Sequence, residues 1–268
     1  MGRAQTIRNA TLGRHALRLV QKDGHFYAMA DGRVLLQGDD PETVWTKLKS
    51  EVGKTDPRYF GFDGARARFL HFFPQGFGPG GFDEVERGYK EGAAIRLRAA
   101  LPLEQALEGG GGGPAALAAV QETNLLSPYE KIRLRALLRS PDADRFVQAA
   151  AGFARDGDRA ALARLAAVAR PHDCAKWTIA TYLPFLWNPD RHMYLKPVVT
   201  QDFAVRVGHP LAALYAPRLG IEVYDALLDL VAQTGRALAD LGPRDGIDIQ
   251  SFIWVVGDYR DEVAATAS

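Results

Sequence analysis

Alternating apolar and polar positions near the start of the chain predict a small antiparallel sheet. The segments ALRLV, HFYAMA and RVLLQ each have the two-residue period of a half-buried strand. They are separated by QKDG and by Asp31-Gly32, a dipeptide that suits the positive φ angles of a tight hairpin turn. Residues 16–37 are therefore predicted to form a three-stranded β-meander.

A helix is predicted directly after the meander. Asp40 can cap the free N–H groups of a helix start, and Pro41 at the first helical position loses no hydrogen bond. Val44, Leu48 and Val52 then recur at helical spacing. Because glycine commonly ends helices, the following Gly53 is expected to terminate this one.

The segment RYFGFDGARARFLHFFPQGF, residues 58–77, combines aromatic and basic side chains and has two interpretations. As a binding surface, its aromatic residues would stack on unpaired bases, while Arg58, Arg66 and Arg68 would contact phosphates. Seven exposed aromatic residues, however, would make a large apolar surface. We therefore expect the aromatic residues to be mostly core and the arginines to remain on an outer, basic side.

The same segment also has a helical period, which supports the core interpretation. Ala65, Phe69, Phe72 and Phe73 would share one face of a helix, with the arginines elsewhere. The loop GFGPGG, residues 76–81, lacks the Lys-Ser/Thr pair of a phosphate-binding P-loop, so we interpret it as a turn between helices.

Five consecutive glycines, residues 109–113, predict a flexible linker between two domains. Beyond them the pattern is helical: Ser127 opens a capping box, Ser140 repeats the Ser-Pro start, and a periodic segment covers residues 222–240. Alternation in residues 247–256 favours a buried strand, with a helix capped by Asp248 as the alternative. The predicted fold class is α+β, with a β-meander and helix domain over 1–108, the linker, and a mainly helical domain over 114–268.

Composition and charge fit an ordinary globular protein. The chain is 47% hydrophobic and 24% charged, with a formal net charge of +1. Without a signal-peptide core or a run approaching 18 apolar residues, it is expected to be soluble, cytoplasmic and without a membrane partner. The first 22 residues hold five basic residues and no acidic one, which predicts a basic arm. Arg14 and Arg18 therefore join the arginines of residues 58–68 as predicted nucleic-acid contacts.

Reactive side chains concentrate in residues 172–196, and we derive from them a candidate anion pocket walled by aromatic residues. Its cations are Lys176, Arg191, His192, Lys196 and Arg244. The alternative is that these cations form structural salt bridges with Asp190, Asp202, Asp245 and Asp248.

Catalytic and metal-binding signals in this block are weak. Cys174 and His192 could in principle meet, but a lone cysteine is more often a small buried apolar residue. His172 and His192 lack a recognisable metal-ligand spacing. Capping and turn formation explain Asp245 and Asp248 adequately. We therefore predict no metal site and no cofactor, and assign no catalytic residue.

The phrases KWTIATYLPFLWNPDRHMYLKP and PRDGIDIQSFIWVV resemble a C-terminal block of uncharacterised bacterial proteins. Some of those proteins resemble components of gene neighbourhoods that handle foreign or modified DNA. The resemblance covers about the last hundred residues and implies a DNA-associated role linked to defence, but no assigned activity and no site residue.

Three hypotheses for function follow. The first is a nucleic-acid-associated accessory or binding protein of the bacterial cytoplasm, with DNA as the expected ligand. The second is a hydrolase or phosphate-ester-processing enzyme that uses residues 172–196 with Arg244. The third is a non-catalytic adaptor that docks a protein partner through an exposed apolar stripe of a C-terminal helix.

Overall fold

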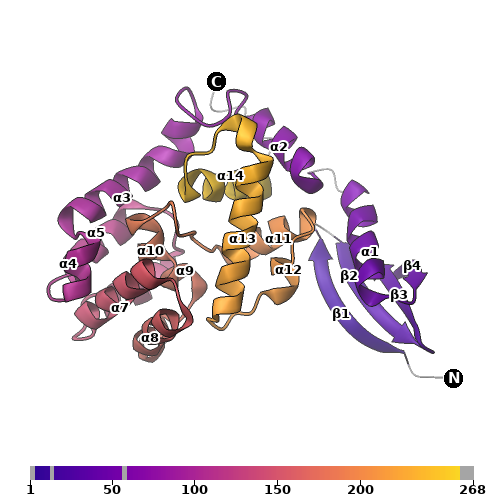
Figure 1. Cartoon of the computed structure of the whole chain (residues 1–268), viewed down its shortest axis with the longest axis horizontal. Helices are drawn as coiled ribbons and strands as arrows, with labels where there is room; N and C mark the ends of the chain where they lie inside the picture. Colours follow the sequence, from indigo (N-terminus) through magenta and orange to yellow (C-terminus); the bar gives the residue numbers. More distant parts are fainter. Residues whose placement is uncertain (1–3, 13–14, 56–58, 260–268) are drawn as a thin grey trace. The chain divides into compact units, whose positions relative to one another are not determined.

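A computed structural model describes residues 4–12, 15–55 and 59–259 and confirms the α+β fold class (Figure 1). The chain divides into two compact units. Unit 1 consists of Met1–Phe72, Val198–Ala213 and Trp254–Ser268, and unit 2 of Phe73–Pro197 and Leu214–Ile253. Each unit is therefore assembled from segments that are distant in sequence.

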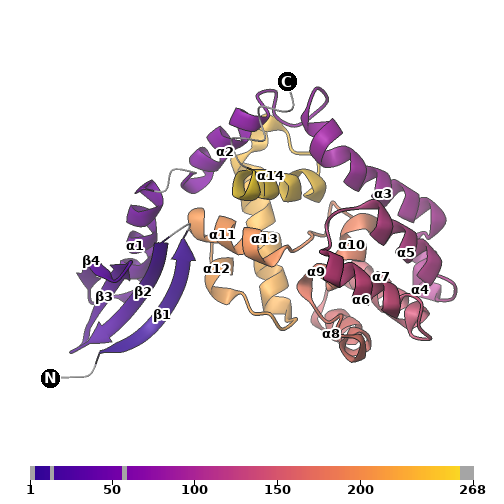
Figure 2. The ribbon, with the colours of Figure 1, turned by 180° about the vertical axis from the view of Figure 1, so that it is seen from behind.

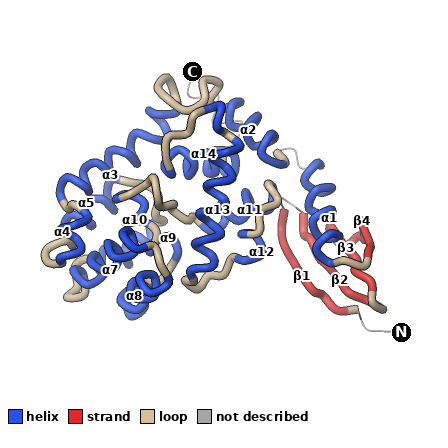
Figure 3. Tube along the Cα trace, viewed as in Figure 1, coloured by secondary structure: helices blue, strands red, loops and turns tan. Residues whose placement is uncertain are grey.

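Unit 1 contains the sheet, whose four strands are hydrogen-bonded in chain order and are all antiparallel (Figure 3). The predicted meander is confirmed, with one further strand before it. The strands are β1 (Gln5–Leu12), β2 (His15–Lys22), β3 (His25–Ala30) and β4 (Arg33–Gly38). The extra strand, β1, and strand β2 both lie within the first 22 residues, which we expected to form a basic arm.

Two Asp-Gly pairs make the hairpin turns, as the sequence predicts. Asp31 and Gly32 have φ angles of 51° and 79°, and Asp23 and Gly24 have φ angles of 49° and 84°. Positive φ at both central residues matches the right-handed twist of the flanking strands. The Asp31 carboxylate also accepts a hydrogen bond from the backbone N–H of Ala16 at 2.9 Å, which fastens the turn to β2.

One face of the sheet packs against helix α1 (Pro41–Thr55), which both views of the ribbon show lying along it (Figures 1 and 2). The predicted cap is confirmed, because the Asp40 carboxylate accepts a hydrogen bond from Thr43 N–H at 2.7 Å. The helix continues past the glycine that we expected to end it. The buried residues of this core are Leu17, Leu19, Ala28, Ala30, Val44, Trp45, Leu48, Val52 and Val205.

The described part of unit 1 also contains α2 (Gly61–Phe72), most of α11 (Pro197–Arg206), part of α12 (Leu211–Leu214) and the C-terminal part of α14 (Gly246–Asp258). Arg206 is fully buried there, and its guanidinium donates to the Asp202 carboxylate at 2.7 Å and to the Tyr59 carbonyl oxygen at 3.1 Å. A buried charge with these partners links α11 to the start of the aromatic-basic segment.

Unit 2 is built from helices in its described part. They are η1 (Asp83–Arg87), α3 (Gly88–Ala100), α4 (Leu103–Glu108), α5 (Gly113–Glu122), α6 (Pro128–Leu137), α7 (Ala143–Asp156), α8 (Arg159–Ala169), η2 (Arg170–His172), α9 (Trp177–Ala180), α10 (Tyr182–Trp187), α13 (Ile221–Ala237), η3 (Ala239–Leu241) and most of α14 (Gly246–Asp258). The capping box at Ser127 is confirmed at the start of α6.

Large aromatic side chains of unit 2 are buried and direct their polar atoms to backbone carbonyl oxygens. Trp187 Nε1 donates to Leu101 O at 3.0 Å, and Tyr182 Oη donates to Ala119 O at 2.7 Å. These bonds satisfy polar groups that would otherwise cost free energy when buried. They also fix α10 against loops and helices from much earlier in the chain.

The five glycines lie inside unit 2, where they connect α4 to α5. The division between the units is elsewhere than the predicted linker, after Phe72. Gly109, Gly110 and Gly111 have positive φ, and a Cβ atom at Gly112 would come within 2.7 Å of a Val147 methyl group. Glycine is therefore required here for a close-packed turn, which the sequence alone does not distinguish from a flexible linker.

The strand favoured for residues 247–256 is wrong, because these residues belong to α14 (Gly246–Asp258). All but one of them, the half-buried Trp254, are buried. A helix that is covered on all sides needs no polar face, so its sequence carries no helical period. The alternation of isoleucines with other residues was therefore no evidence for a strand.

Replacing Trp187 by alanine should lower the free energy of unfolding by about 3–5 kcal/mol, because it removes a buried ring and leaves a cavity. Urea unfolding followed by circular dichroism measures the loss. Tyr129→Ala is the matched control, because Tyr129 is 78% exposed on α6 and its loss should change stability little. Equal stability losses in the two variants would contradict the assignment of Trp187 to the core.

Candidate functional site

Unit 2 contains a cluster of charged side chains where η1 and α3 meet the start of α14. Segment η1 has π-helical geometry, with Gly88 N–H bonded to Asp83 O. Such segments are rare and frequently lie at functional sites, which makes this cluster a candidate functional site. We call it the charged cluster; its members are Asp83, Glu86, Arg87, Lys90, Glu91, Arg244, Asp245, Asp248 and Ser251.

Arg87 is the centre of the charged cluster and is only 5% exposed. Its Nη1 donates to Asp245 at 2.9 Å and to Asp248 at 2.8 Å. Its Nη2 donates to Asp245 and to Glu91, both at 2.8 Å. Burial alone would lower the pKa of Arg87, but these three carboxylates raise it far above its usual value. The guanidinium is therefore permanently charged and paired with three carboxylates, although its Nε is buried without a hydrogen-bond partner among the described residues.

Arg244, predicted to line the anion pocket, instead forms salt bridges in this cluster. Its Nε donates to the Asp248 carboxylate at 2.8 Å, and its Nη2 donates to Asp83 at 2.5 Å. Asp248 has 0% exposure and accepts hydrogen bonds from Arg87 as well. This is the structural salt bridge that the sequence offered as the alternative to an anion site.

Lys90 occupies the deepest part of the charged cluster, with 1% exposure. Its Nζ donates to the Glu86 carboxylate at 2.9 Å and to Ser251 Oγ at 2.6 Å. Burial lowers the pKa of Lys90, the attraction of Glu86 opposes that shift, and the charge of Lys196 lowers the pKa further. A lysine beside a serine is one arrangement that activates a nucleophile. Here, however, Ser251 has no exposed surface to offer a substrate.

The remaining residues of the predicted anion pocket have separate partners. Lys176 pairs with Asp173 at 3.6 Å, and Arg191 donates to the Arg155 carbonyl oxygen at 3.5 Å. Only Lys196 is close enough to the charged cluster to influence a pKa there. These bonds indicate structural roles for the first two cations.

The two histidines of residues 172–196 form hydrogen bonds within the protein, and the cysteine of this segment is buried. His192 Nε2 donates to Ala154 O at 2.8 Å, which leaves Nδ1 to accept from Tyr224 Oη at 2.7 Å. Burial lowers the pKa of His192, so the imidazole is neutral at pH 7. His172 pairs with Asp142 at 3.0 Å. Burial raises the pKa of the Cys174 thiol to about 11, which disfavours the nucleophilic thiolate.

The glycine-rich loop of residues 76–81 binds a carboxylate of its own chain. The Glu84 side chain accepts hydrogen bonds from Gly81 N–H at 2.7 Å and from Gly80 N–H at 3.1 Å. These bonds lower the pKa of Glu84, so it is ionised at neutral pH. The loop therefore closes on its own helix, as expected of a turn.

The aromatic-basic segment of residues 58–77 is largely core. Tyr59, Phe69 and Phe73 are buried, which fits the interpretation that we preferred. Arg58 lies outside the described residues, and Arg66 is half-buried. Arg68 donates to Val256 O at 3.0 Å and to Tyr259 O at 2.5 Å, at the end of α14. This arginine thus satisfies helix-terminal carbonyl groups, and phosphate binding would compete with that role.

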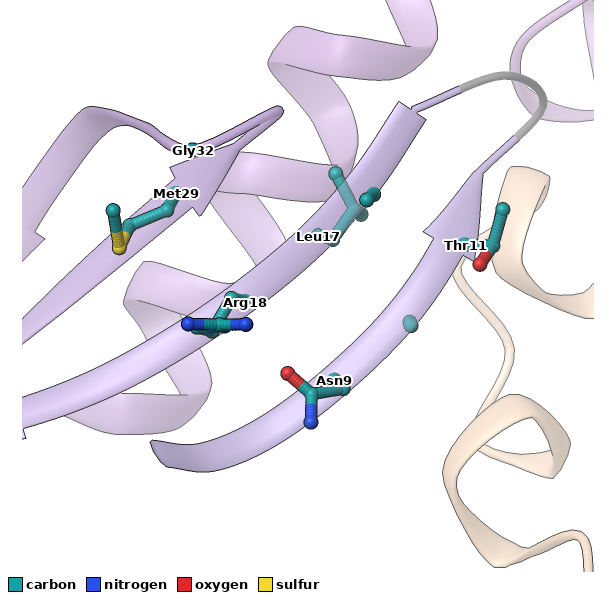
Figure 4. A pocket seen from close by; sticks show the side chains of 8 residues that line it. Asn9, Thr11, Leu17, Arg18, Met29 and Gly32 are labelled. Atoms are coloured by element: carbon teal, nitrogen blue, oxygen red, sulfur yellow. The ribbon is translucent and has the colours of Figure 1, made fainter. Parts of the chain in front are cut away.

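Of the two basic residues predicted nearer the N-terminus, Arg14 lies outside the described residues, and Arg18 is exposed on β2. Arg18 points away from the α1-covered side, because its neighbours Leu17 and Leu19 are in the core. Asn9 on β1 and Met29 on β3 are its direct partners across the strands. Figure 4 shows these three side chains in one row on the outward face of the sheet.

A hollow of about 580 Å³ lies beside this row (Figure 4). It exists because the adjoining positions have small side chains or none: Thr11 pairs with Ala16 across β1 and β2, and Gly32 lies in the turn after β3. We call this surface the outward hollow. Its lining is Asn9, Ala10, Thr11, Ala16, Leu17, Arg18, Met29 and Gly32.

Sequence reasoning identified Arg18 but missed Asn9 and Met29, the two residues beside it. The available signal was the alternation of β2, which already separates Arg18 from Leu17 and Leu19. Strand β1 was not recognised, so its register against β2 was unknown. Without a register, no residue could be placed opposite Arg18.

Comparison with protein-family models, curated proteins and solved structures finds no match for this chain. Within the described ranges, no group of three or more His, Cys, Asp or Glu side chains is placed to hold a metal ion. Among the helices of those same ranges, none has the length and apolar content to span a bilayer.

Arg87→Met should destabilise unit 2 by about 3–5 kcal/mol, because it leaves buried carboxylates without their counter-charge. Denaturant unfolding measures the change. Arg96→Met is the matched control, because Arg96 pairs with Glu122 on the surface and should be worth less than about 1 kcal/mol. A loss no larger than that of the control would show that the charged cluster is not a structural centre.

Lowering the pH should reduce the free energy of unfolding, in part because the carboxylate of Asp245 becomes protonated. Burial raises the pKa of Asp245, but the hydrogen bonds and charge of Arg87, with the N–H groups of Asp248 and Ile247, outweigh burial and lower it. A carboxyl whose folded-state pKa is lowered gives stability that is complete above the unfolded value of about 3.9 and is lost as pH falls through the folded-state value. Asp245→Asn should therefore be less stable than wild type at pH 7, with the gap narrowing toward pH 2. A gap that stays constant with pH would refute this role.

Proposed function

We propose that this protein binds nucleic acid through the outward face of its N-terminal sheet. The observation that supports this most is the charge of the strands: none of β1 to β4 contains an aspartate or glutamate. Arg18 and Lys22 are exposed at alternate, outward positions of β2. A polyanion would therefore meet cations on this surface without a strand carboxylate to repel it.

Two acidic residues near the sheet already have partners, and Asp23 lies next to Lys22 in the turn between β2 and β3. Asp31 lies in a turn, where His15 and the Ala16 N–H group bind its carboxylate. Glu42 pairs with Arg8, which extends over the Trp45 ring on the α1-covered side. Arg18 and Lys22 remain directed outward, and they are the cations that we assign to the ligand.

The ligand class follows from the outward residues around these cations, with the apolar Val20 directly between them on β2. Outward positions hold polar side chains that donate and accept hydrogen bonds, such as Asn9 and Thr11, and one aromatic ring, Tyr27. Amide, hydroxyl and guanidinium groups, with ring stacking, are the groups that bind bases and phosphates. DNA is the first ligand to test, since the C-terminal block resembles one in uncharacterised bacterial proteins, some of which resemble components of gene neighbourhoods that handle foreign or modified DNA.

The enzyme hypothesis has less support. It requires the side chains of His172, His192 and Asp245 to converge, and each is hydrogen-bonded to different partners.

The adaptor hypothesis has one observation in its favour: Tyr129 and Ile132, one helical turn apart on α6, are 78% and 64% exposed. If it holds, Tyr129→Ala together with Ile132→Ala should abolish co-purification of a defined partner without changing nucleic-acid affinity.

A salt titration with single-stranded and duplex DNA tests the proposal. Wild type should bind with an affinity that falls as salt rises. Replacing both Arg18 and Lys22 with alanine should weaken binding and reduce the slope of log affinity against log salt by roughly 0.7–1.8, for one or two lost phosphate contacts.

The matched control is Arg98→Ala, an exposed arginine on α3 in unit 2. It should leave both affinity and slope unchanged. The proposal fails if wild type shows no affinity for any nucleic acid at low salt, or if the double variant binds like wild type.

A further inference from the structure

We infer that the outward hollow seats one unpaired base of a single-stranded nucleic acid, whose edge hydrogen-bonds to Asn9 and Arg18. This inference rests on the proposed function and adds to it the form of the ligand and the residues that select a base. It is carried by the row of Asn9, Arg18 and Met29 and by the small residues beside that row.

The dimensions of the hollow suit a base. Its volume of about 580 Å³ lies within the roughly 300–1,000 Å³ that small-molecule sites occupy. Ala16 and Thr11 are paired across β2 and β1 and line the hollow with smaller side chains than those of Arg18 and Asn9. A flat ring can lie on these smaller side chains with its edge toward the larger ones.

The chemistry of the row suits a purine, and guanine best. The guanidinium of Arg18 offers two parallel donors, which match the O6 and N7 acceptors of guanine. The amide of Asn9 adds a donor and an acceptor from the neighbouring strand. Met29, on the other side of Arg18, supplies an adaptable apolar surface. The whole lining contains no carboxylate that would repel the backbone of the ligand.

The shape favours a single strand over a duplex. Reading base edges within a duplex requires an element that projects into the major groove. The outward hollow is a depression on the face of the sheet and does not project from it, so it suits a base that leaves the stack better than a duplex groove. Unpaired bases offer both their faces and their edges, which is how single-strand binding surfaces select them.

The roles of the two outward cations then separate. Arg18 adjoins the hollow and contacts the base, whereas Lys22 lies four residues along β2, outside the lining, and is left for phosphate. Replacing Lys22 should therefore change the salt dependence of binding, whereas replacing Arg18 or Asn9 should change the base preference.

The test uses the full chain and thymidine oligonucleotides that carry one central deoxyguanosine, deoxyadenosine or deoxycytidine. Wild type should bind the guanine oligonucleotide roughly tenfold more tightly than the all-thymidine one. Replacing that guanine with 7-deazaguanine, which lacks the N7 acceptor, should remove most of the preference. A duplex of the same sequence should bind more weakly than the single strand.

Three variants assign the residues, after circular dichroism has confirmed that each is folded. Arg18→Lys keeps the charge but not the paired donors, so the guanine preference should be lost with the salt slope unchanged. Asn9→Ala should also reduce the preference. Lys22→Ala is the matched control, and it should lower the slope by roughly 0.7 while preserving the preference.

The outcomes distinguish this inference from the proposed function. Equal affinity for all the oligonucleotides, or tighter binding of the duplex, would overturn the inference that the outward hollow binds one unpaired base. The proposal that the protein binds nucleic acid would not be affected. A preference that survives Arg18→Lys and Asn9→Ala would also overturn the inference about the outward hollow. Absence of binding to every oligonucleotide at low salt would overturn both.

Discussion

The burial of Arg87 is the constraint on which unit 2 depends. A guanidinium cannot shed its charge in a protein, so it enters the interior only with carboxylates to compensate it. Two of its partners, Asp245 and Asp248, follow it by 158 and 161 residues. The start and the end of the unit must therefore come together before Arg87 can be buried, and the intervening helices are held between them. Asp248 extends the same arrangement to Arg244.

The two units use their polar groups in different ways. In unit 2 the reactive side chains that the sequence singles out, such as His192 and Arg244, form hydrogen bonds and salt bridges within the unit. In unit 1 one face of the sheet is packed on α1, while the other carries outward-directed cations and no strand carboxylate. A surface with uncompensated charge has affinity left for a ligand, whereas a closed salt-bridge network does not.

The arginines show why residue type alone does not define a site. Arg68 and Arg18 look alike in sequence, and both are candidate phosphate contacts. Arg68 donates hydrogen bonds to carbonyl groups at the end of α14, nearly two hundred residues later in the chain. Arg18 is exposed on the outward face of β2. Whether a cation is available depends on what the rest of the chain places beside it. The same holds for the glycines before α5, where Gly110 and Gly111 have positive φ and Gly112 lies close to Val147.

The sequence by itself determined the features that arise from neighbouring residues. The Asp-Gly turns, the caps at Asp40 and Ser127, and the inward and outward sides of β2 all follow from local geometry and short periods. Only the tertiary structure decided the helical state of α14, the assembly of each unit from distant segments, and the pairing of β1 that brings Asn9 beside Arg18. The physical reason is burial: a fully covered helix has no polar face, and a partner far along the chain leaves no mark in the local pattern.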